Sequence, residues 1–159
     1  MRSMDIIIET GKLRQKPERM RAEMPSAVLE MDSGDLVRAD GPLRYDLTVQ
    51  RAFNELVVRG TLSVNFKCLC ARCGVCFIKK VFIGDFCRSF ALKSKSELIN
   101  LTPDVREDIL LALPMVAVCS NACRGLCAGC GVNLNSGKCK CVRKIETDKW
   151  QILDGLRLR

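Results

Sequence analysis

Histidine is absent from this chain of 159 residues, and its absence limits the chemistry that the chain can perform. Histidine is the commonest general base and the usual partner of a serine or cysteine nucleophile. We therefore expect no hydrolytic or proteolytic mechanism and predict that the protein is not an enzyme. Any metal site must be built from cysteine thiolates, with a carboxylate as the remaining option.

Aromatic residues and long apolar runs are also scarce. One Trp, one Tyr and six Phe leave few side chains on which nucleic-acid bases could stack. No apolar run approaches the ~18 residues of a membrane span. The apolar run at residues 6–8 is too short for the core of a signal peptide. We expect a cytoplasmic protein that binds no membrane and no small-molecule substrate.

The composition is that of a globular protein with an excess of positive charge. Hydrophobic residues make up 48% and charged residues 28% of the chain, which supports a folded core. The formal net charge is +8. Eight cysteine thiolates that bind two zinc ions would together contribute about −4, which would leave a net charge of about +4. Basic residues gather in segments 12–21, 67–95 and 138–159. Such segments suit contact with phosphates, and a merely solvated surface is the alternative.

Alternation of apolar and polar residues with a period of two predicts two strands in the first half of the chain. They cover residues 43–50 and 56–66. The short link at Phe53 and Asn54 predicts that these strands form an antiparallel hairpin. A further strand is expected over residues 75–83.

A single helix is predicted over residues 102–114. Thr102 suits the N-cap of this helix, and Pro114 suits its end. Residues 84–101 are expected to form a loose connection before the helix, and residues 6–8 to add an edge strand.

Together these elements predict an α+β fold made of an antiparallel sheet, one or two short helices and a C-terminal zinc knob. Residues 1–101 would form the β domain with the first cysteine knuckle. Residues 102–159 would form the helix, the cysteine-rich knob and a closing helix with Trp150, Leu153 and Leu156 on one face. We expect both parts to pack as one globular unit.

Eleven cysteines without a signal peptide favour metal binding over disulfides. Two C-x-x-C-G knuckles and two further close pairs provide enough thiolates for two tetrahedral zinc sites. The candidate ligands are Cys70, Cys73, Cys119, Cys123, Cys127, Cys130, Cys139 and Cys141.

The four close pairs can combine into two sites in three ways. Loop closure favours a local site from the last four, because the loop of residues 131–138 is short. The first four would then tie the sheet to the knob. The alternative joins the two knuckles in one rubredoxin-like site. The one-residue spacer between Cys139 and Cys141 is tight for one ion, so either could be a spectator, and Cys68 could replace Cys70 as a ligand.

The remaining cysteines, Cys68, Cys76 and Cys87, are expected to be small buried hydrophobic residues. A redox dithiol is another use of a C-x-x-C pair. Neither pair opens a helix of a βαβ unit, and other thiols crowd both, so we favour metal binding.

The order and spacing of these motifs resemble the YceD family of large ribosomal RNA accumulation proteins. The motifs are the knuckle Cys70–Cys73, the helix Arg106–Pro114, and the run Cys119–Asn135 followed by Cys139 and Cys141. The resemblance covers residues 43–157. Lys149 stands where the closing motif of the family usually has proline.

The resemblance implies a bacterial or plastid protein needed for accumulation of 23S rRNA and for large-subunit assembly. Its partner would be ribosomal RNA, a ribosomal protein or both. Basic residues beside the cysteines are candidate RNA contacts: Arg72, Arg124, Lys138, Lys140, Arg143 and Lys144. A zinc-ribbon adaptor in transcription and a thiolate–iron electron carrier are the alternative functions.

Overall fold

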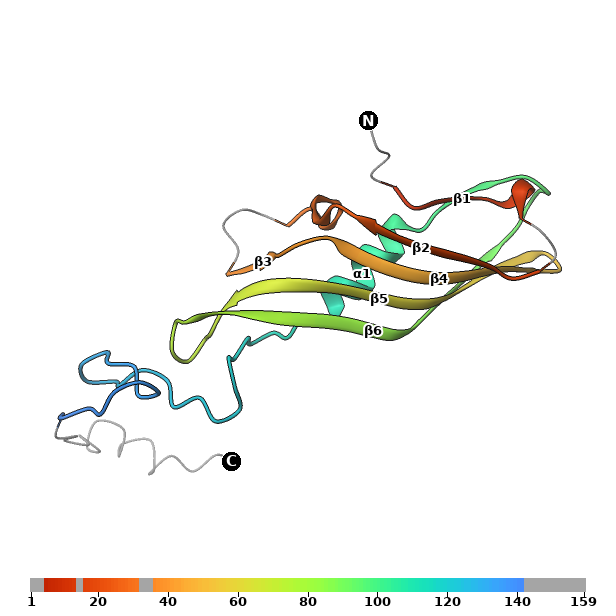
Figure 1. Ribbon diagram of the computed structural model, residues 1–159. Coiled ribbons are helices and arrows are strands. Elements are labelled where there is room, and N and C mark those ends of the chain that lie inside the picture. Colours follow the sequence, from red (N-terminus) through yellow and green to blue (C-terminus); the bar gives the residue numbers. More distant parts are fainter. Residues whose placement is uncertain (1–4, 14–15, 32–35, 142–159) are drawn as a thin grey trace, which may run out of the picture.

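The computed structural model describes residues 5–13, 16–31 and 36–141. An antiparallel sheet forms an elongated body, α1 lies against one of its faces, and a cysteine-rich knob (residues 119–141) extends beyond one end (Figure 1). The predicted antiparallel sheet and C-terminal cysteine knob are confirmed, although the protein is mostly β rather than clearly α+β. The predicted closing helix at Trp150, Leu153 and Leu156 lies outside the described residues.

The main sheet has five strands, and β5 is at its centre. β5 pairs with β6 along one edge, and with β4 and then β3 along the other, while β2 pairs with the outer edge of β4. All of these pairs are antiparallel. The strands are β2 (Glu18–Met24), β3 (Val37–Ala39), β4 (Leu43–Ala52), β5 (Glu55–Leu69) and β6 (Cys76–Ala91).

A second, two-stranded sheet and three helical segments complete the described structure. The sheet pairs β1 (Ile7–Glu9) with β7 (Leu98–Asn100), so the predicted N-terminal strand is present at residues 7–9 but does not form an edge of the main sheet. The helical segments are the 3₁₀ turns η1 (Thr10–Lys12) and η2 (Ser26–Leu29) and the helix α1 (Thr102–Leu111). Within the described part of the chain, no helix is long and apolar enough to cross a membrane.

The predicted hairpin is confirmed between β4 and β5. Ala52 lies opposite Glu55, so that Phe53 and Asn54 alone form the turn. Phe53 has a φ of 53°, in the left-handed region that tight hairpin turns use. Phe53 is 98% exposed.

The core lies between the main sheet and α1. Alternate residues of β4 and β5 point toward the helix and are buried, among them Leu47, Val58 and Phe66. They belong to one cluster with Val105 and Ile109 of α1. This alternation is the physical reason for the period-two pattern, because successive side chains of a strand point to opposite faces.

Strand β6 is longer than the sequence predicts. Gly60 pairs with Phe86 while Leu62 pairs with Ile83, so a β-bulge at residues 84–85 interrupts the alternation. The strand continues beyond it to Ala91. The expectation of a loose connection over residues 84–101 was therefore wrong for its first half, and it also missed β7.

The start of α1 differs from the prediction as well. Thr102 is the first helical residue rather than the N-cap, which is Leu101. The Thr102 hydroxyl oxygen accepts a hydrogen bond from the backbone N–H of Ile6 at 2.8 Å. It therefore fastens the N-terminal strand to the helix instead of capping it. Asp104 does lie in the first turn, where it pairs with Arg88 of β6 at 3.2 Å.

Of the three cysteines that were expected to be small buried hydrophobic residues, only Cys68 is buried. Cys76 and Cys87 are exposed. Cys76 pairs with Leu69 and Cys87 with Arg59, and both of these β5 residues point away from α1. Strand register rather than apolar sequence context decides the exposure of a cysteine here.

Candidate metal centres

The first knuckle forms the tip of the long β5–β6 hairpin. The backbone N–H of Cys70 donates to the carbonyl of Val75 at 2.9 Å, and that of Gly74 donates to the carbonyl of Cys70 at 2.8 Å. Gly74 has a φ of +68°, a conformation that favours glycine. The turn therefore holds Cys70 and Cys73 on one side of the hairpin tip, where both are buried.

The second knuckle repeats the same turn in the knob. The backbone N–H of Cys127 donates to the carbonyl of Val132 at 2.8 Å, and that of Gly131 donates to the carbonyl of Cys127 at 2.8 Å. Gly131 has a φ of +74°. Two segments far apart in sequence thus share one local structure, as their common C-A-x-C-G-V sequence indicates.

The first knuckle meets the loop that follows α1, and together they form the first cysteine cluster. Its four sulfur atoms all lie within 4.8 Å of one another. The Sγ atoms of Cys70 and Cys123 are 3.8 Å apart, and those of Cys73 and Cys119 are also 3.8 Å apart. A tetrahedron of thiolates around zinc, with Zn–S bonds of about 2.3 Å, has S–S edges of about 3.8 Å. The first cluster therefore fits one tetrahedral ion.

The second cysteine cluster is built from the second knuckle and the short segment after the loop. Its members are Cys127, Cys130, Cys139 and Cys141, and their sulfur atoms again lie within 4.8 Å of one another. The Sγ of Cys139 is 3.1 Å from that of Cys127 and 3.6 Å from that of Cys130. A bound ion would hold the first of these pairs slightly further apart. Both Cys139 and Cys141 face the same point, so neither is displaced from the cluster.

This is the division of ligands that loop closure favours. The two knuckles belong to different clusters, so the alternative in which both knuckles share one rubredoxin-like site is wrong. Cys68 is not a member of either cluster. The first cluster joins a segment that precedes α1 in the sequence to one that follows it, whereas all four cysteines of the second cluster lie in the knob.

Backbone amides and crowding divide the thiols of each cluster into acidic and basic members. The N–H of Cys119 points at the Sγ of Cys70 at 3.4 Å and lowers the pKa of that thiol to about 6. A hydrogen bond from the backbone of Cys130 is the main cause that lowers the pKa of Cys127 to about 6. Neighbouring thiols raise the pKa of Cys119 and of Cys141 to about 12. Four thiolates so close together repel one another, and a divalent cation removes that repulsion.

The two clusters are connected through the loop of the second. The Asn135 side chain donates from Nδ2 to the Sγ of Cys123 at 3.4 Å, and its Oδ1 accepts from the N–H of Arg124 at 2.8 Å. The backbone N–H of Leu126 donates to the carbonyl of Arg72 at 3.0 Å. These bonds place the second cluster directly against the first knuckle.

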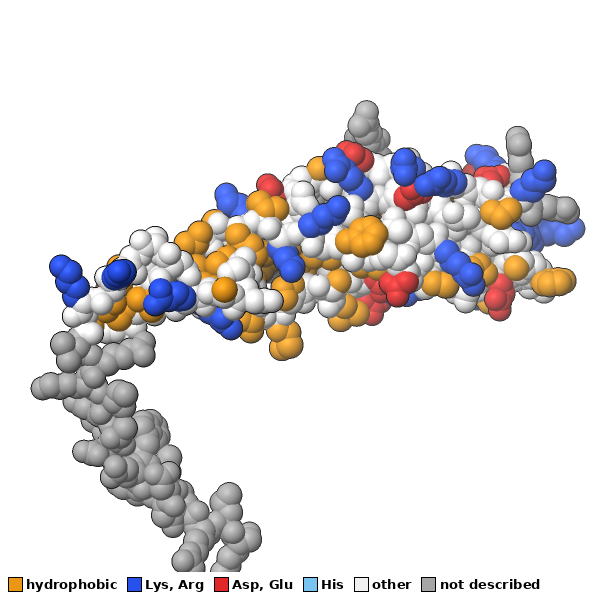
Figure 2. Space-filling view, turned by 60° about the horizontal axis from the view of Figure 1, so that its bottom comes forward, with side chains coloured by type: hydrophobic (Ala, Val, Ile, Leu, Met, Phe, Trp, Pro, Cys, Tyr) orange, Lys and Arg blue, Asp and Glu red, His pale blue; other side chains and the backbone are white. Residues whose placement is uncertain are grey.

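The predicted RNA contacts have different surroundings. Arg72 is exposed, but its Nη1 donates to the carbonyl of Cys123 at 3.2 Å and of Asn121 at 3.4 Å, so it braces the first cluster. Arg124, Lys138 and Lys140 are exposed on the knob. Basic side chains are visible at the knob end of the molecule (Figure 2). Arg143 and Lys144 lie outside the described residues.

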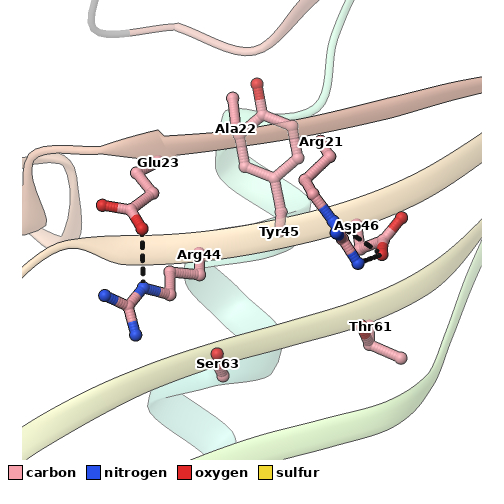
Figure 3. Close-up of a pocket in the computed structure, with 8 residues that line it drawn as sticks. All are labelled: Arg21, Ala22, Glu23, Arg44, Tyr45, Asp46, Thr61 and Ser63. Carbon is pink, nitrogen blue, oxygen red and sulfur yellow. Dashed lines mark hydrogen bonds and ion pairs between the residues drawn. The ribbon is translucent and has the colours of Figure 1, made fainter.

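A feature that sequence reasoning missed is a hollow of about 540 Å³ on the face of the main sheet opposite α1 (Figure 3). Arg21 donates to Asp46 at 2.6 Å and Arg44 donates to Glu23 at 2.8 Å within it. It went unnoticed because β2, which supplies Arg21 and Glu23, was not predicted. The charged residues that alternate along β2 are the signal that could have revealed it.

Comparisons with known proteins point to one family. Residues 89–157 match the family described as large ribosomal RNA subunit accumulation protein YceD. A 51-residue stretch is 41% identical to the chloroplastic large ribosomal RNA subunit accumulation protein YCED homolog 1 of Arabidopsis thaliana. That stretch is 32% of this chain and 16% of the relative's length. No solved structure matches the chain.

The matched residues begin in β6 and include α1 and the whole knob, but not the first knuckle at the β5–β6 tip. They are thus fewer than the residues 43–157 over which the motifs suggest a resemblance. The second cysteine cluster and two ligands of the first, Cys119 and Cys123, fall inside them. The resemblance is confirmed over residues 89–157, where this chain is similar to the YceD family.

Proposed function

We propose that this protein is a zinc-binding ribosome biogenesis factor. In this role it is needed for accumulation of 23S rRNA and for assembly of the large subunit. It acts by binding RNA, a ribosomal protein or both, and it performs no catalysis. The observation that carries the proposal is the match of residues 89–157, which contain most of the cysteine ligands, to a family named for accumulation of large-subunit ribosomal RNA.

Zinc is the metal that the ligand sets favour. Each cluster offers four thiolates and no histidine, and all four positions around an ion would be filled by protein. Closed tetrahedral thiolate sites are typical of structural zinc, which needs no open position for a substrate. The same ligands suit an iron–thiolate site, and the colour of the purified protein separates these two cases.

The zinc ions would have a structural task. The first would fasten the knob to the hairpin tip, since its ligands come from both. The second would fix the loop of residues 131–138, which presents Lys138 beside Cys139. A backbone that is already fixed by a metal ion loses little further conformational entropy on binding, and this favours contact of its basic side chains with phosphates.

Depletion of the protein tests the proposed function. The 23S rRNA and the large subunit should fall relative to the small subunit, and the native gene should restore both. A gene carrying Cys130→Ser should restore them poorly. Normal subunit ratios after full depletion would contradict the proposal. The protein should be found in the cytoplasm, or in the plastid if the source is a plant.

A further inference from the structure

One face of the main sheet is left open by the fold. Even-numbered residues of β5 point toward α1 and the core, and odd-numbered residues point away from it. In Figure 1, α1 lies behind the sheet, and no other described element covers the near face. We call this near side the open face. It lies mostly outside the residues that match the YceD family, since β2 to β5 all precede residue 89.

The open face is predominantly basic. Two of its carboxylates are already satisfied: Asp46 pairs with both Arg19 and Arg21, and Glu23 pairs with Arg44. Among the described residues, Arg59, Lys67 and Lys80 form no ion pair. Strand register assigns seven basic side chains to this face: Arg19, Arg21, Arg38, Arg44, Arg59, Lys67 and Lys80.

An exposed aromatic ring lies among these charges. Phe82 points outward from β6 and is 61% exposed. The Lys80 ammonium is 5.9 Å from the centre of its ring. Gly84 is beside it, where a Cβ atom would come within 3.2 Å of the ring edge. A glycine at the bulge therefore leaves that side of the ring uncrowded.

The surface next to Phe82 is hollowed. Ser63 is the direct cross-strand partner of Phe82, and it lines two hollows together with Arg44. One is the 540 Å³ hollow, and the other has about 200 Å³ and also contains Asn65, Lys80 and the carboxylate of Asp40. Cations, hydroxyl and amide groups and an aromatic ring thus form one continuous surface across β4, β5 and β6.

We infer that the open face binds single-stranded RNA, with a base stacked on Phe82 and phosphates held by Lys67, Lys80 and Arg44. This inference rests on the proposed function for its choice of RNA as partner and adds a second surface, distinct from the knob. Positive charge complements the phosphate backbone. A sheet that displays an exposed ring suits unpaired bases, whereas a base in a duplex is already stacked between its neighbours.

The test uses the full zinc-loaded chain and a fluorescent RNA of about 12 nucleotides without self-complementarity, a length within the usual site size. Phe82→Ala should weaken binding about 5- to 150-fold, the range for loss of one stacked base. Phe53→Ala is the matched control, because Phe53 is more exposed than Phe82 and lies at the hairpin turn. It should bind as the native protein does.

The salt dependence of RNA binding tests the contribution of the lysines on the open face. Replacing both lysines, Lys67→Gln with Lys80→Gln, should reduce the slope of log affinity against log salt by about 1.4, at about 0.7 per phosphate on a single strand. A duplex of the same length should bind more weakly than the single strand. Both variants should keep the native zinc content and circular dichroism spectrum.

Two results would overturn the inference. In the first, the native chain binds the single strand, the open-face variants bind equally well, and Lys138→Glu with Lys140→Glu removes binding. RNA binding would then belong to the knob, and the proposed function would stand. In the second, the native chain binds no RNA but retains a purified ribosomal protein. The open-face assignment would then be wrong, while subunit ratios after depletion would still decide the proposed function.

Discussion

The side-chain amide of Asn135 donates a hydrogen bond to the Sγ of Cys123 across 3.4 Å, and so joins the loop of the second cysteine cluster to a ligand of the first. This bond favours the ionised thiol, because it is the main cause that lowers the pKa of Cys123. Groups that hold metal ligands in place commonly affect metal affinity as the ligands do. The two clusters are therefore expected to be coupled.

Asn135→Ala should weaken metal binding at the first cluster by about 10- to 100-fold, the usual effect of removing such a supporting bond. Competition with a coloured zinc chelator measures this affinity directly. Asn121→Ala is the control, since Asn121 accepts from Arg72 through its backbone carbonyl, which the substitution keeps. Equal affinities for both variants would show that the clusters are independent.

Cys130→Ser and Cys73→Ser should have different effects, because only the first cluster joins the knob to the sheet. Cys130→Ser should remove one of two ions and leave the thermal unfolding of the sheet nearly unchanged. Cys73→Ser should lower the melting temperature and release the knob, since structural zinc carries on the order of 10 kcal/mol of coupled folding energy. Zinc content, thermal melting and limited proteolysis of each variant provide the comparison. Identical, global unfolding of both variants would contradict this division.

The cysteine pairs could be predicted because the spacing within each pair is a local property of the sequence, and the short loop of the second cluster then favoured the division between the clusters. Both knuckles carry the glycine that their turn needs, at Gly74 and Gly131. The supporting bond from Asn135 could not be predicted in the same way. It depends on how the loop of the second cluster packs against Cys123, which only the folded chain determines.

The strands likewise divide into those that local sequence predicts and those that it does not. β4 and β5 are half-buried, so their alternation was visible, and the hairpin at Phe53 followed from it. β2 buries a single residue, Met24, and gives almost no apolar signal. In β6 the bulge after Ile83 breaks the period, and the exposure of Cys87 could not be deduced without the register.

Gly60→Ala should destabilise the sheet strongly. A Cβ atom at this position would lie 2.1 Å from the carbonyl oxygen of Asp46, which is backbone and cannot turn aside. The strands would have to separate, and we expect a loss of about 1–3 kcal/mol or more in the free energy of unfolding, measured by denaturant titration. Gly137→Ala is the control, because its nearest new contact is an ordinary 3.5 Å to Val132. Unchanged stability of Gly60→Ala would mean that β4 and β5 are not packed as described.

Charge reversal on the knob should reduce retention of ribosomal RNA. Lys138→Glu with Lys140→Glu removes two exposed cations beside the second cluster and should make binding both weaker and less dependent on salt. Adding Arg143→Glu and Lys144→Glu should deepen the effect. Zinc content should not change, and the ratio of large to small subunits in cells should fall.

The matched control reverses two exposed lysines far from the knob, Lys16→Glu with Lys93→Glu. It changes the net charge by the same amount. If both double variants lose RNA equally, net charge alone governs retention. If neither loses RNA and subunit ratios stay normal, the knob lysines serve solubility only.

Metal content tests the central claim most directly. Protein produced without excess zinc, purified under reducing conditions and analysed by elemental mass spectrometry should contain about two zinc ions per chain, one for each tetrahedral thiolate cluster. The solution should be colourless. Iron accompanied by visible absorption, or a folded chain that contains no metal, would contradict the account.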